Sequence, residues 1–389
     1  MQLTAQAGLP HDGTSGALAA RVWRPDVDGP SIVALRGDDV IDISASFPTL
    51  RDLCEAPDPA AALRQANGQR IASVAQLFAN TAPDTRQPER PWLLAAADLQ
   101  PIKAAGVTFA VSMLERVIEE KARGNPAAAA AIRQEIVALV GDDLSKLKPG
   151  STQAMALKKV LIAQSAWSQY LEVGIGPDAE IFTKAPPMAA VGTGADAGLH
   201  PSSSWNNPEP ELVLAVNSRS KIVAASLGND VNLRDLEGRS ALLLGKAKDN
   251  NASAVIGPCL RFFDATFSLD DVRRTTITLK VEGEDGFVLE GFSSMSQISR
   301  DPLDLVAQMM GSHHQYPDGA MLFLGCMFAP VQDRDTVGGG FTHKVGDIVT
   351  ISAPQLGSLV NRMRRTDQCP PWTFGTGQLM RNLARRGLL

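Results

Sequence analysis

Short apolar runs separated by turn-forming residues dominate the chain from about residue 182 onward. This texture is typical of β-strands. The clearest run, Leu212–Val216, follows Pro210, which lacks an N–H and favours an extended backbone in the residue before it, so we expect a buried strand there. The polar segment Asn217–Lys221 predicts a turn, and Ile222–Ala225 predicts the strand that returns from it.

The N-terminal part of the chain shows a different pattern. Ile32–Leu35 and Val40–Ile43 flank a glycine-containing turn, which predicts a β-hairpin. Prolines punctuate the segment that follows, and residues 71–78 have the apolar spacing of a short helix. We therefore expect residues 1–95 to form a small separate domain and residues 96–389 to form a larger one.

Helical periodicity lies between these two regions. A helical pattern begins near Thr108 and ends at Gly124, because apolar residues recur there at intervals of three and four positions. Pro126 suits the first turn of an alanine-rich helix that extends to about Val140, and a further helix is expected over residues 152–171. Together with the later β-strands, these segments predict an α+β fold.

Composition and charge exclude several classes of protein. The 389 residues carry 37 Lys and Arg against 42 Asp and Glu without long like-charge runs, so we expect no nucleic-acid partner. A hydrophobic content of 44% is ordinary for a globular protein, and no apolar stretch approaches the length of a membrane span. The four cysteines lack the spacing of a zinc ribbon or a disulfide framework, which favours a reducing, cytoplasmic setting.

Three acids around the strand at Leu212–Val216 predict a metal site. Glu209 and Glu211 are two residues apart, and side chains two apart on a strand point to the same face. The returning strand brings Asp230 toward this pair. Like charges packed so closely need a cation or a proton, and oxygen ligands suit Mg²⁺, Mn²⁺ or Ca²⁺ better than zinc. On spacing alone, a solvated strand edge is the competing interpretation.

The neighbouring motifs resemble those of the fumarylacetoacetate hydrolase superfamily. They occur in the family's order over residues 100–370, and several ordered motifs are more specific than any one of them. The matching segments are Ile181–Pro186, Glu209–Leu212, Gly228–Val231 with Arg234 and Asp235, Lys248 ahead of Val255–Pro258, Lys344–Val349 and Leu356–Asn361. The resemblance implies an α+β fold in which a small N-terminal α/β domain precedes a mixed β-roll catalytic domain.

The same resemblance implies roles for the acids and for two lysines. Glu209, Glu211 and Asp230 would hold the divalent cation, with Mg²⁺ the first choice, and Lys248 would lie beside it. A nearby ammonium offsets the excess negative charge and favours an anionic intermediate. Taken alone, Lys248 would be interpreted as a surface residue and Lys184 as a structural one. With the resemblance, Lys184 becomes a candidate contact for the substrate.

The predicted helix carries the residues expected to matter most for the reaction. In the hydrolytic founder of the family a histidine occupies the position aligned with Glu115, so Glu115 is a candidate general acid/base here. Arg116 could hold a substrate carboxylate through its planar guanidinium, and Ser112 is a further candidate substrate contact. Without the resemblance, the pairing of Glu119 with Arg123 and similar pairs would indicate a salt-bridged exposed face.

Two further residues are candidate substrate contacts. His200 lies nine residues before Glu209, and its alternative role is that of a loop histidine satisfied by the backbone. Cys326 stands where the family commonly has the threonine of a Gly-Thr pair. A thiol is a weaker hydrogen-bond donor than a hydroxyl, so this position departs from the family pattern.

The segment from Gly106 to Arg116 is similar to the branch of the family that contains 2-keto-3-deoxy-D-xylonate and D-arabinonate dehydratases. The resemblance implies Mg²⁺-dependent dehydration of a 2-keto-3-deoxy sugar acid to a 2-oxo-semialdehyde through a metal-stabilised enolate, with Glu115 or a neutral Lys248 removing the C3 proton. The alternatives are a metal-dependent acylpyruvate-type C–C hydrolase or 2-oxo acid decarboxylase, and a 2-oxo acid binding protein without turnover. The expected partners are the small 2-keto acid and further copies of the chain in a homodimer or larger homo-oligomer.

Overall fold

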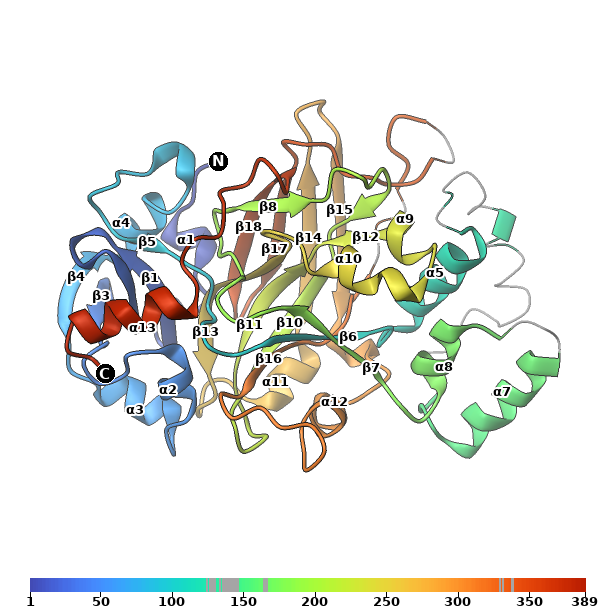
Figure 1. Cartoon of the computed structure of the whole chain (residues 1–389), viewed down its shortest axis with the longest axis horizontal. Coiled ribbons are helices and arrows are strands. Elements are labelled where there is room, and N and C mark those ends of the chain that lie inside the picture. The colour runs from blue at the N-terminus through green and yellow to red at the C-terminus, as the bar shows by residue number, and fades with distance from the viewer. Residues whose placement is uncertain are drawn as a thin grey trace.

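The computed structural model describes residues 1–389 except 124, 126–130, 133, 135–146, 164–166, 329, 331 and 337–338. Within the described part, the chain forms one large mixed sheet, a smaller sheet packed against it, and helices around both (Figure 1). None of the described helices has both the length and the apolar character needed to cross a membrane.

The large sheet has 11 strands in the order β4-β3-β2-β1-β13-β11-β10-β16-β6-β7, with β5 paired to β1. Its pairs are antiparallel except for the parallel pair β16 and β6. The strands are β1 (Ala17–Arg24), β2 (Gly29–Arg36), β3 (Asp39–Asp42), β4 (Gln69–Ser73), β5 (Trp92–Leu93), β6 (Ile102–Gly106), β7 (Glu180–Ala185), β10 (Pro210–Val216), β11 (Ile222–Asp230), β13 (Ala254–Phe262) and β16 (Ala320–Phe323).

The smaller sheet has five strands in the order β15-β14-β17-β18-β8, and a two-stranded ribbon of β12 and β9 lies apart from it. These strands are β8 (Asp196–Leu199), β9 (Asn206–Asn207), β12 (Asn232–Leu233), β14 (Thr276–Glu282), β15 (Val288–Ser294), β17 (Ile348–Ala353) and β18 (Gly357–Arg365).

Short helices join and cover the sheets. In Figure 1, α5, α7 and α8 lie at one end of the molecule, and α13 lies at the other end beside the N-terminal strands. The helices are α1 (Ala5–Gly8), α2 (Leu50–Cys54), α3 (Pro59–Gln65), α4 (Val74–Ala79), α5 (Ala110–Lys121), α7 (Thr152–Ala163), α8 (Gln169–Ile175), α9 (Arg234–Glu237), α10 (Leu244–Lys248), α11 (Leu269–Arg274), α12 (Pro302–Met309) and α13 (Thr376–Arg385), with 3₁₀ turns η1 (Pro25–Val27), η2 (Pro83–Thr85), η4 (Ala241–Leu243) and η5 (Met295–Gln297).

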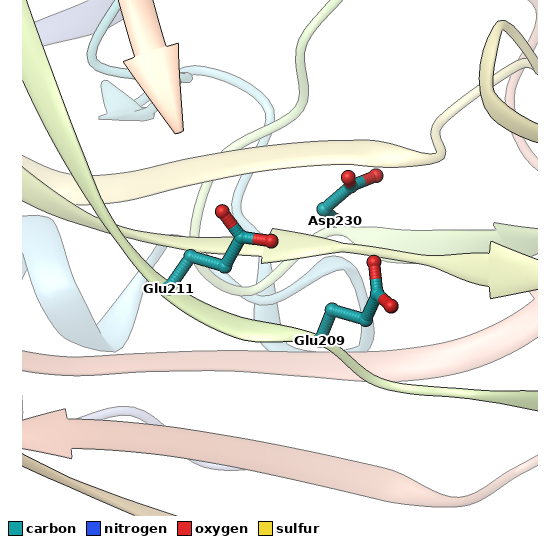
Figure 2. Close-up of side chains that lie close together, drawn as sticks. All are labelled: Glu209, Glu211 and Asp230. Atoms are coloured by element: carbon teal, nitrogen blue, oxygen red, sulfur yellow. The ribbon is translucent and has the colours of Figure 1, made fainter. Parts of the chain in front are cut away.

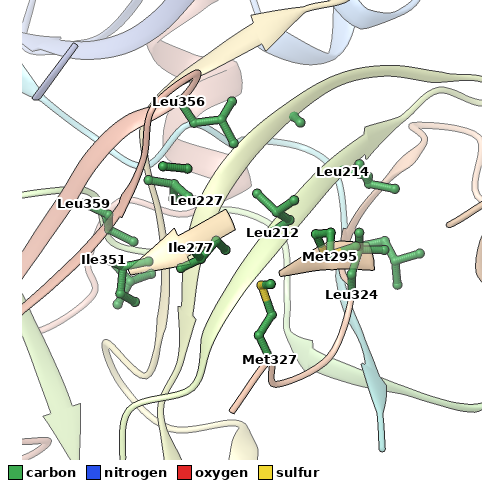
Figure 3. Close-up of a cluster of buried hydrophobic side chains, with 14 of the residues drawn as sticks. Leu212, Leu214, Leu227, Ile277, Met295, Leu324, Met327, Ile351, Leu356 and Leu359 are labelled. Atoms are coloured by element: carbon green, nitrogen blue, oxygen red, sulfur yellow. The ribbon is translucent and has the colours of Figure 1, made fainter. Parts of the chain in front are cut away.

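The central strand β10 is buried on both faces, and this fixes where its acids point. Leu212 and Leu214 join the core between the two sheets, which Figure 3 shows together with side chains from β14, β17 and β18. Val213 and Ala215 belong to a different cluster on the opposite face. Because side chains alternate along a strand, Glu211 shares the face of Val213 and lies away from the leucine core.

Several elements confirm the pattern of the sequence. The hairpin around residue 37 is β2 and β3, whose register pairs Leu35 with Val40. The strand, turn and returning strand expected over residues 212–225 are β10 and β11. The helix expected from Thr108 to Gly124 is α5, and the later β texture and the α+β class are confirmed as well.

Three helical expectations need comment. The helix over residues 71–78 was partly wrong, because its first residues belong to β4 and Ser73 begins α4 with a capping box. The single helix over residues 152–171 was wrong, since Ser168 caps a separate helix, α8. The alanine-rich helix from residue 126 to 140 lies outside the described residues, apart from isolated positions.

The N-terminal strands are continuous with the larger unit. β1 pairs with β13 through the register Ala17 to Phe262, so residues 1–95 contribute strands to the same sheet as β10 and β11. The C-terminal helix closes over this region, where the Asn382 side chain donates to the carbonyl oxygens of Val27 and Asp28 at 2.9 Å each. The division at residue 95 remains a prediction about independent folding.

Candidate active site

The structure brings the three predicted acids together (Figure 2). Glu209 directly precedes β10, Glu211 is the second residue of β10, and Asp230 is the last residue of β11. The backbone N–H of Asp230 donates to the carbonyl oxygen of Glu209 at 3.1 Å, which joins the two segments. One carboxylate oxygen from each of the three residues lies within 4.8 Å of the others, and all three side chains are buried.

Burial away from water raises the free energy of the ionised form of these carboxylates. Burial raises the pKa of Glu211 well above its ordinary value, and the charges of Asp230 and Glu209 raise it further. Burial also raises the pKa of Glu209. For Asp230 burial acts in the same direction, but the neighbouring lysines outweigh it and the pKa is lowered. The cluster therefore holds more negative charge than its surroundings favour.

Lys248 forms ion pairs with two of the three acids. Its Nζ lies 2.7 Å from Glu209 Oε2 and 3.0 Å from Asp230 Oδ2, and 3.2 Å from Glu237 Oε1. Burial alone would lower its pKa, but these carboxylates reverse the effect and raise the pKa well above the ordinary value. The contacts stabilise an ammonium, so they disfavour the neutral Lys248 that proton abstraction requires.

Lys184 contacts Asp230 from outside the described lining of the cavity. It is fully buried, and its Nζ lies 2.8 Å from Asp230 Oδ1 while donating to the carbonyl oxygens of Lys248 at 2.8 Å and Val231 at 3.2 Å. An ammonium has three hydrogens, and each has an acceptor here. Lys184 is absent from the described lining of the cavity, so its position suits a support for Asp230 better than a substrate contact.

Arg116 reaches the cluster from α5. Its Nη1 lies 2.6 Å from Glu237 Oε2, and its Nη2 donates to Glu209 Oε1. The guanidinium that the sequence suggested for a substrate carboxylate is thus already engaged by two carboxylates of the protein. It still borders the cavity and supplies positive charge there.

These residues line a cavity of about 220 Å³. The acids lie on the side formed by β10 and β11, whereas α8 and the segment around η4 form other parts of the wall. The described lining consists of Ala105, Gly106, Val107, Arg116, Gln169, Tyr170, Val173, Glu180, Phe182, Glu209, Glu211, Asp230, Glu237, Ser240, Ala241, Leu244, Lys248 and Cys326.

Glu180 is a lining residue that the sequence reasoning did not identify. Burial raises its pKa to about 7, and the charge of Glu237 adds to the effect while Arg116 opposes it. In the described part of the chain, no hydrogen bond or ion pair holds its carboxylate. Gly106 makes room for it, because a Cβ at that position would lie 1.9 Å from Glu180 Oε2. Glu180 directly precedes the family-like segment Ile181–Pro186, which was the available signal.

The other candidates of the α5 segment lie at different positions. Glu115 is buried at 8% exposure but does not belong to the described cavity lining, although its neighbour Arg116 does. Ser112 belongs to α5, and its side chain lies outside the described part of the structure. Their proposed roles remain predictions.

His200 and Cys326 lie in different parts of the structure. His200 lies in the turn after β8, where its Nδ1 is 2.8 Å from Ser202 Oγ, and it is absent from the described cavity lining. The chain turns away there because β8 pairs with β18 in the other sheet. Cys326 is buried and lines the cavity, with its thiol donating to the carbonyl oxygen of Phe328 at 3.1 Å. The position of Cys326 thus suits a substrate contact, and that of His200 suits a loop residue.

The residues of the cavity fit a divalent cation. Five carboxyl groups line it, against two cationic side chains and the supporting Lys184. When all are ionised, two negative charges remain without a partner among these residues, and a divalent cation would balance them. The three oxygens within 4.8 Å of one another are also the donor type that Mg²⁺ prefers. Gly325 N–H donates to Glu211 Oε2 at 2.7 Å and so fixes the orientation of one candidate ligand.

The chain shares its fold with solved dehydratase structures, and the acid cluster lies where the sequence motifs predicted a metal site. No family model matches the chain. Solved structures with the same fold include dehydratases. The chain superimposes on a 2-keto-3-deoxyarabinonate dehydratase with a TM-score of 0.61 at 21% identity, covering 90% of this chain and 99% of the other. A 2-keto-3-deoxy-D-arabinonate dehydratase complexed with magnesium and 2,5-dioxopentanoate gives a TM-score of 0.56 at 22% identity over the same shares.

Curated relatives point to the same dehydratases. A 2-dehydro-3-deoxy-D-arabinonate dehydratase of Saccharolobus solfataricus is 30% identical over 189 residues, which is 48% of this chain and 59% of that protein. A probable 2-keto-3-deoxyxylonate dehydratase of Haloferax volcanii is 29% identical over 192 residues, which is 49% of this chain and 62% of that protein. The matches thus span about three fifths of the length of each relative.

Proposed function

We propose that this chain is a Mg²⁺-dependent hydro-lyase that converts a 2-keto-3-deoxypentonate, such as the D-xylonate or D-arabinonate form, into 2,5-dioxopentanoate. The single observation that carries the proposal is the cavity in which three acids converge within 4.8 Å beside Glu180, a carboxyl with a pKa of about 7. The similarity to two 2-keto-3-deoxypentonate dehydratases supports the choice of substrate. The magnesium complex of a dehydratase with the same fold supports the choice of metal.

Glu209, Glu211 and Asp230 would hold the cation. When bound, a divalent ion acts as a Lewis acid that polarises the keto group of a 2-keto acid and makes its C3 protons more acidic. Arg116 and Lys248 add positive charge at the edge of the same cavity, so they favour an anionic substrate and the negative charge that develops on it. Lys184 keeps Asp230 ionised and in place.

Glu180 is the best-placed general base for the C3 proton. Its carboxylate borders the cavity without a partner in the described structure, and a pKa near the working pH is the value at which a carboxyl can both accept and return a proton. In the proposed reaction the C3–H and C4–O bonds break and a C3–C4 double bond forms. The proton that Glu180 accepts is returned to the departing hydroxyl, which leaves as water. A proton then moves from C5 to C3, which gives a 4,5-enol. The enol loses its hydroxyl proton and gains a proton at C4 to give the aldehyde, so that water is the only group lost.

Polar groups elsewhere in the cavity are available for the hydroxyl groups of the substrate. Gln169 and Ser240 line the wall. Among the described residues, Ser240 Oγ accepts from the N–H of Leu242 at 3.2 Å and donates to no partner, so its proton is available to a substrate. The apolar residues Val107, Val173 and Leu244 surround them. We assign to this wall the choice between sugar acids of different length.

We further propose that the enzyme works in the cytoplasm as a homo-oligomer. The four cysteines are all free and buried, which suits a reducing compartment. The solved dehydratase covers nearly the whole chain, which is consistent with one fold per subunit.

The decisive experiment offers the purified chain two substrates in parallel, a 2-keto-3-deoxy-D-pentonate and an acylpyruvate. The names 2-keto-3-deoxy-D-xylonate and 2-keto-3-deoxy-D-arabinonate denote one compound, because C4 is its only stereocentre. With MgCl₂ and this compound, we expect 2,5-dioxopentanoate, identified by mass spectrometry and NMR, and we expect EDTA to abolish its formation. Cleavage of the acylpyruvate with no dehydration of the pentonate would replace this proposal by the hydrolase alternative. Binding of Mg²⁺ and 2-oxo acid without turnover of any substrate would favour the non-catalytic alternative.

A further inference from the structure

A second cavity of about 230 Å³ lies where the N-terminal strands meet the C-terminal segment. It shares none of its described lining residues with the acid-lined cavity. Three of the five tryptophans of the chain line it, namely Trp23, Trp92 and Trp372. Two arginines, Arg21 and Arg86, line it as well.

Strand register gathers these side chains on one face. Arg21 and Trp23 are two residues apart on β1, so their side chains point the same way. Trp92 on β5 pairs directly with Trp23, and the N–H of Leu94 donates to the carbonyl oxygen of Arg21 at 2.8 Å. The cationic and aromatic walls of the cavity therefore come from adjacent positions of two paired strands.

The aromatic wall is ordered by ring contacts. The rings of Trp23 and Trp92 are stacked with centroids 6.1 Å apart and an interplanar angle of 22°. The ring of Phe374 meets Trp23 edge-on at 5.2 Å, and Trp372 Nε1 donates to the carbonyl oxygen of Phe374 at 3.1 Å. Such a wall offers flat π-surfaces to a planar ligand.

Arg21 is a buried cation with few acceptors. Arg21 is only 5% exposed. Its guanidinium donates to the carbonyl oxygen of Ala97 at 3.1 Å and to Met188 Sδ at 3.5 Å. A guanidinium has five N–H donors, and a thioether sulfur is a weak acceptor. No carboxylate of the described residues forms an ion pair with it. Burial lowers the pKa of Arg21, and Asp98 offsets this only from a distance.

The remaining charges of the cavity leave it positive. Arg86 lies over the ring of Trp92 at 4.5 Å, and its buried Nε has no hydrogen-bond partner. The acidic member of the lining, Asp196, is already engaged by Arg362 at 3.0 Å and Arg364 at 3.3 Å. Two guanidinium groups therefore face the cavity without a carboxylate of their own in the described structure.

We propose that this cavity is a binding site for a small planar organic carboxylate, separate from the acid-lined site. The carboxylate would pair with Arg21 and Arg86, whose planar guanidinium groups match its two oxygens. The planar body would lie against the wall of Trp23, Trp92 and Phe374. The occupant supplies the acceptors that Arg21 lacks, which is the physical reason to expect a ligand with an anionic head and not a neutral apolar one.

Benzoate is a suitable probe, with benzamide as its uncharged counterpart. Added to the full-length chain, benzoate should quench tryptophan fluorescence with a Kd below about 1 mM, a modest affinity for a ligand of this size. Benzamide should bind at least 10-fold more weakly, because its amide cannot replace the carboxylate opposite two cations. Acetate, which has the charge without the ring, should also bind at least 10-fold more weakly.

Two variants locate the binding. Arg21→Met and Arg86→Gln should each weaken benzoate binding at least 10-fold, whereas Glu211→Gln, in the other cavity, should leave it unchanged. Arg86→Gln keeps the test valid if Arg21→Met does not fold by circular dichroism. Equal binding of benzoate and benzamide, no binding of either, or unchanged binding by Arg86→Gln would overturn the proposal. The result does not depend on dehydratase activity, so failure of either proposal leaves the other standing.

Discussion

The acid-lined cavity and the arginine-lined cavity have nearly equal volumes, about 220 and 230 Å³, but opposite charge. Five carboxyl groups line the first, and three of them converge within 4.8 Å. Two arginines and an aromatic wall line the second. Each cavity holds buried charge that its own protein partners do not balance. The comparison teaches that the identity of the missing charge, and not the size of the space, indicates the ligand that each cavity accepts.

The largest effect is expected from Glu211→Gln. This change removes one of the three converging oxygens and one negative charge, so Mg²⁺ binding should weaken by more than the roughly 10²-fold that loss of an outer partner costs. Calorimetric titration with MgCl₂ measures the affinity, and Glu172→Gln, at an exposed partner of Lys158, is the matched control. Full Mg²⁺ affinity in Glu211→Gln would show that Glu211 is not a ligand. The acid-lined cavity would then no longer be explained by a missing cation.

Glu180→Gln should leave Mg²⁺ affinity nearly unchanged and lower kcat by about 10² to 10⁴ fold, the range for loss of a general acid/base. Glu115→Gln is the matched variant, because the sequence suggested Glu115 for the same role. Since Glu115 is absent from the described lining, we expect it to lower kcat by less than about 10-fold. If the two variants exchange these effects, the proton transfer belongs to Glu115.

The pH profile of the same variants sharpens this assignment. The pKa of Glu180 is raised to about 7, so its ionised, basic form increases as the pH rises through neutrality. A bound cation would lower this pKa. We therefore expect kcat of the native protein to rise with pH and level off at or below about pH 7, and we expect this limb to be absent from Glu180→Gln. If kcat of Glu180→Gln still rises with pH in this range, the titrating group is not Glu180.

Gly106→Ala should have an intermediate effect. The added Cβ would lie 1.9 Å from Glu180 Oε2, so the carboxylate must move, and because it ends a side chain the shift is cheap for stability. We expect kcat to fall by about 10-fold with a nearly unchanged midpoint of thermal unfolding, since misplacement of a reacting group by about 1 Å is costly. Unchanged kcat would show that the position of Glu180 does not matter.

Cys326→Thr should have the smallest effect. A hydroxyl can still donate to the carbonyl oxygen of Phe328, so kcat/KM should change by less than about 10-fold. Burial and the charges of Glu209 and Glu211 raise the pKa of the Cys326 thiol well above its ordinary value. Alkylation of this thiol near pH 8 should accordingly be slow, as measured by mass spectrometry with and without denaturant. Rapid labelling of the folded protein would contradict the burial of Cys326.

The sequence predicted what is local and missed what depends on distant segments. Glu209, Glu211 and Asp230 were identified because a strand, a turn and a returning strand place them together by register alone. Glu180 was missed because its raised pKa depends on burial beside Glu237, far along the chain.

His200 was a candidate substrate contact with a loop histidine as its alternative. The structure places it after β8, which pairs with β18 in the other sheet, and its role remains a prediction. The second cavity was also beyond prediction, because it requires β1 and the segment after Cys369 to meet. The motifs that resemble the family predicted the fold, and the solved dehydratase structures confirm this fold.

The alternation of side chains along β10 constrains how this protein can evolve. Its odd-numbered positions carry Glu211, Val213 and Ala215, and its even-numbered positions carry the leucines of the core. Inserting or deleting a single residue here would exchange the two faces, placing a carboxylate among leucines and a leucine among the ligands. Homologues with new specificities should therefore arise by replacement in the walls around this strand, with the length of β10 itself held fixed.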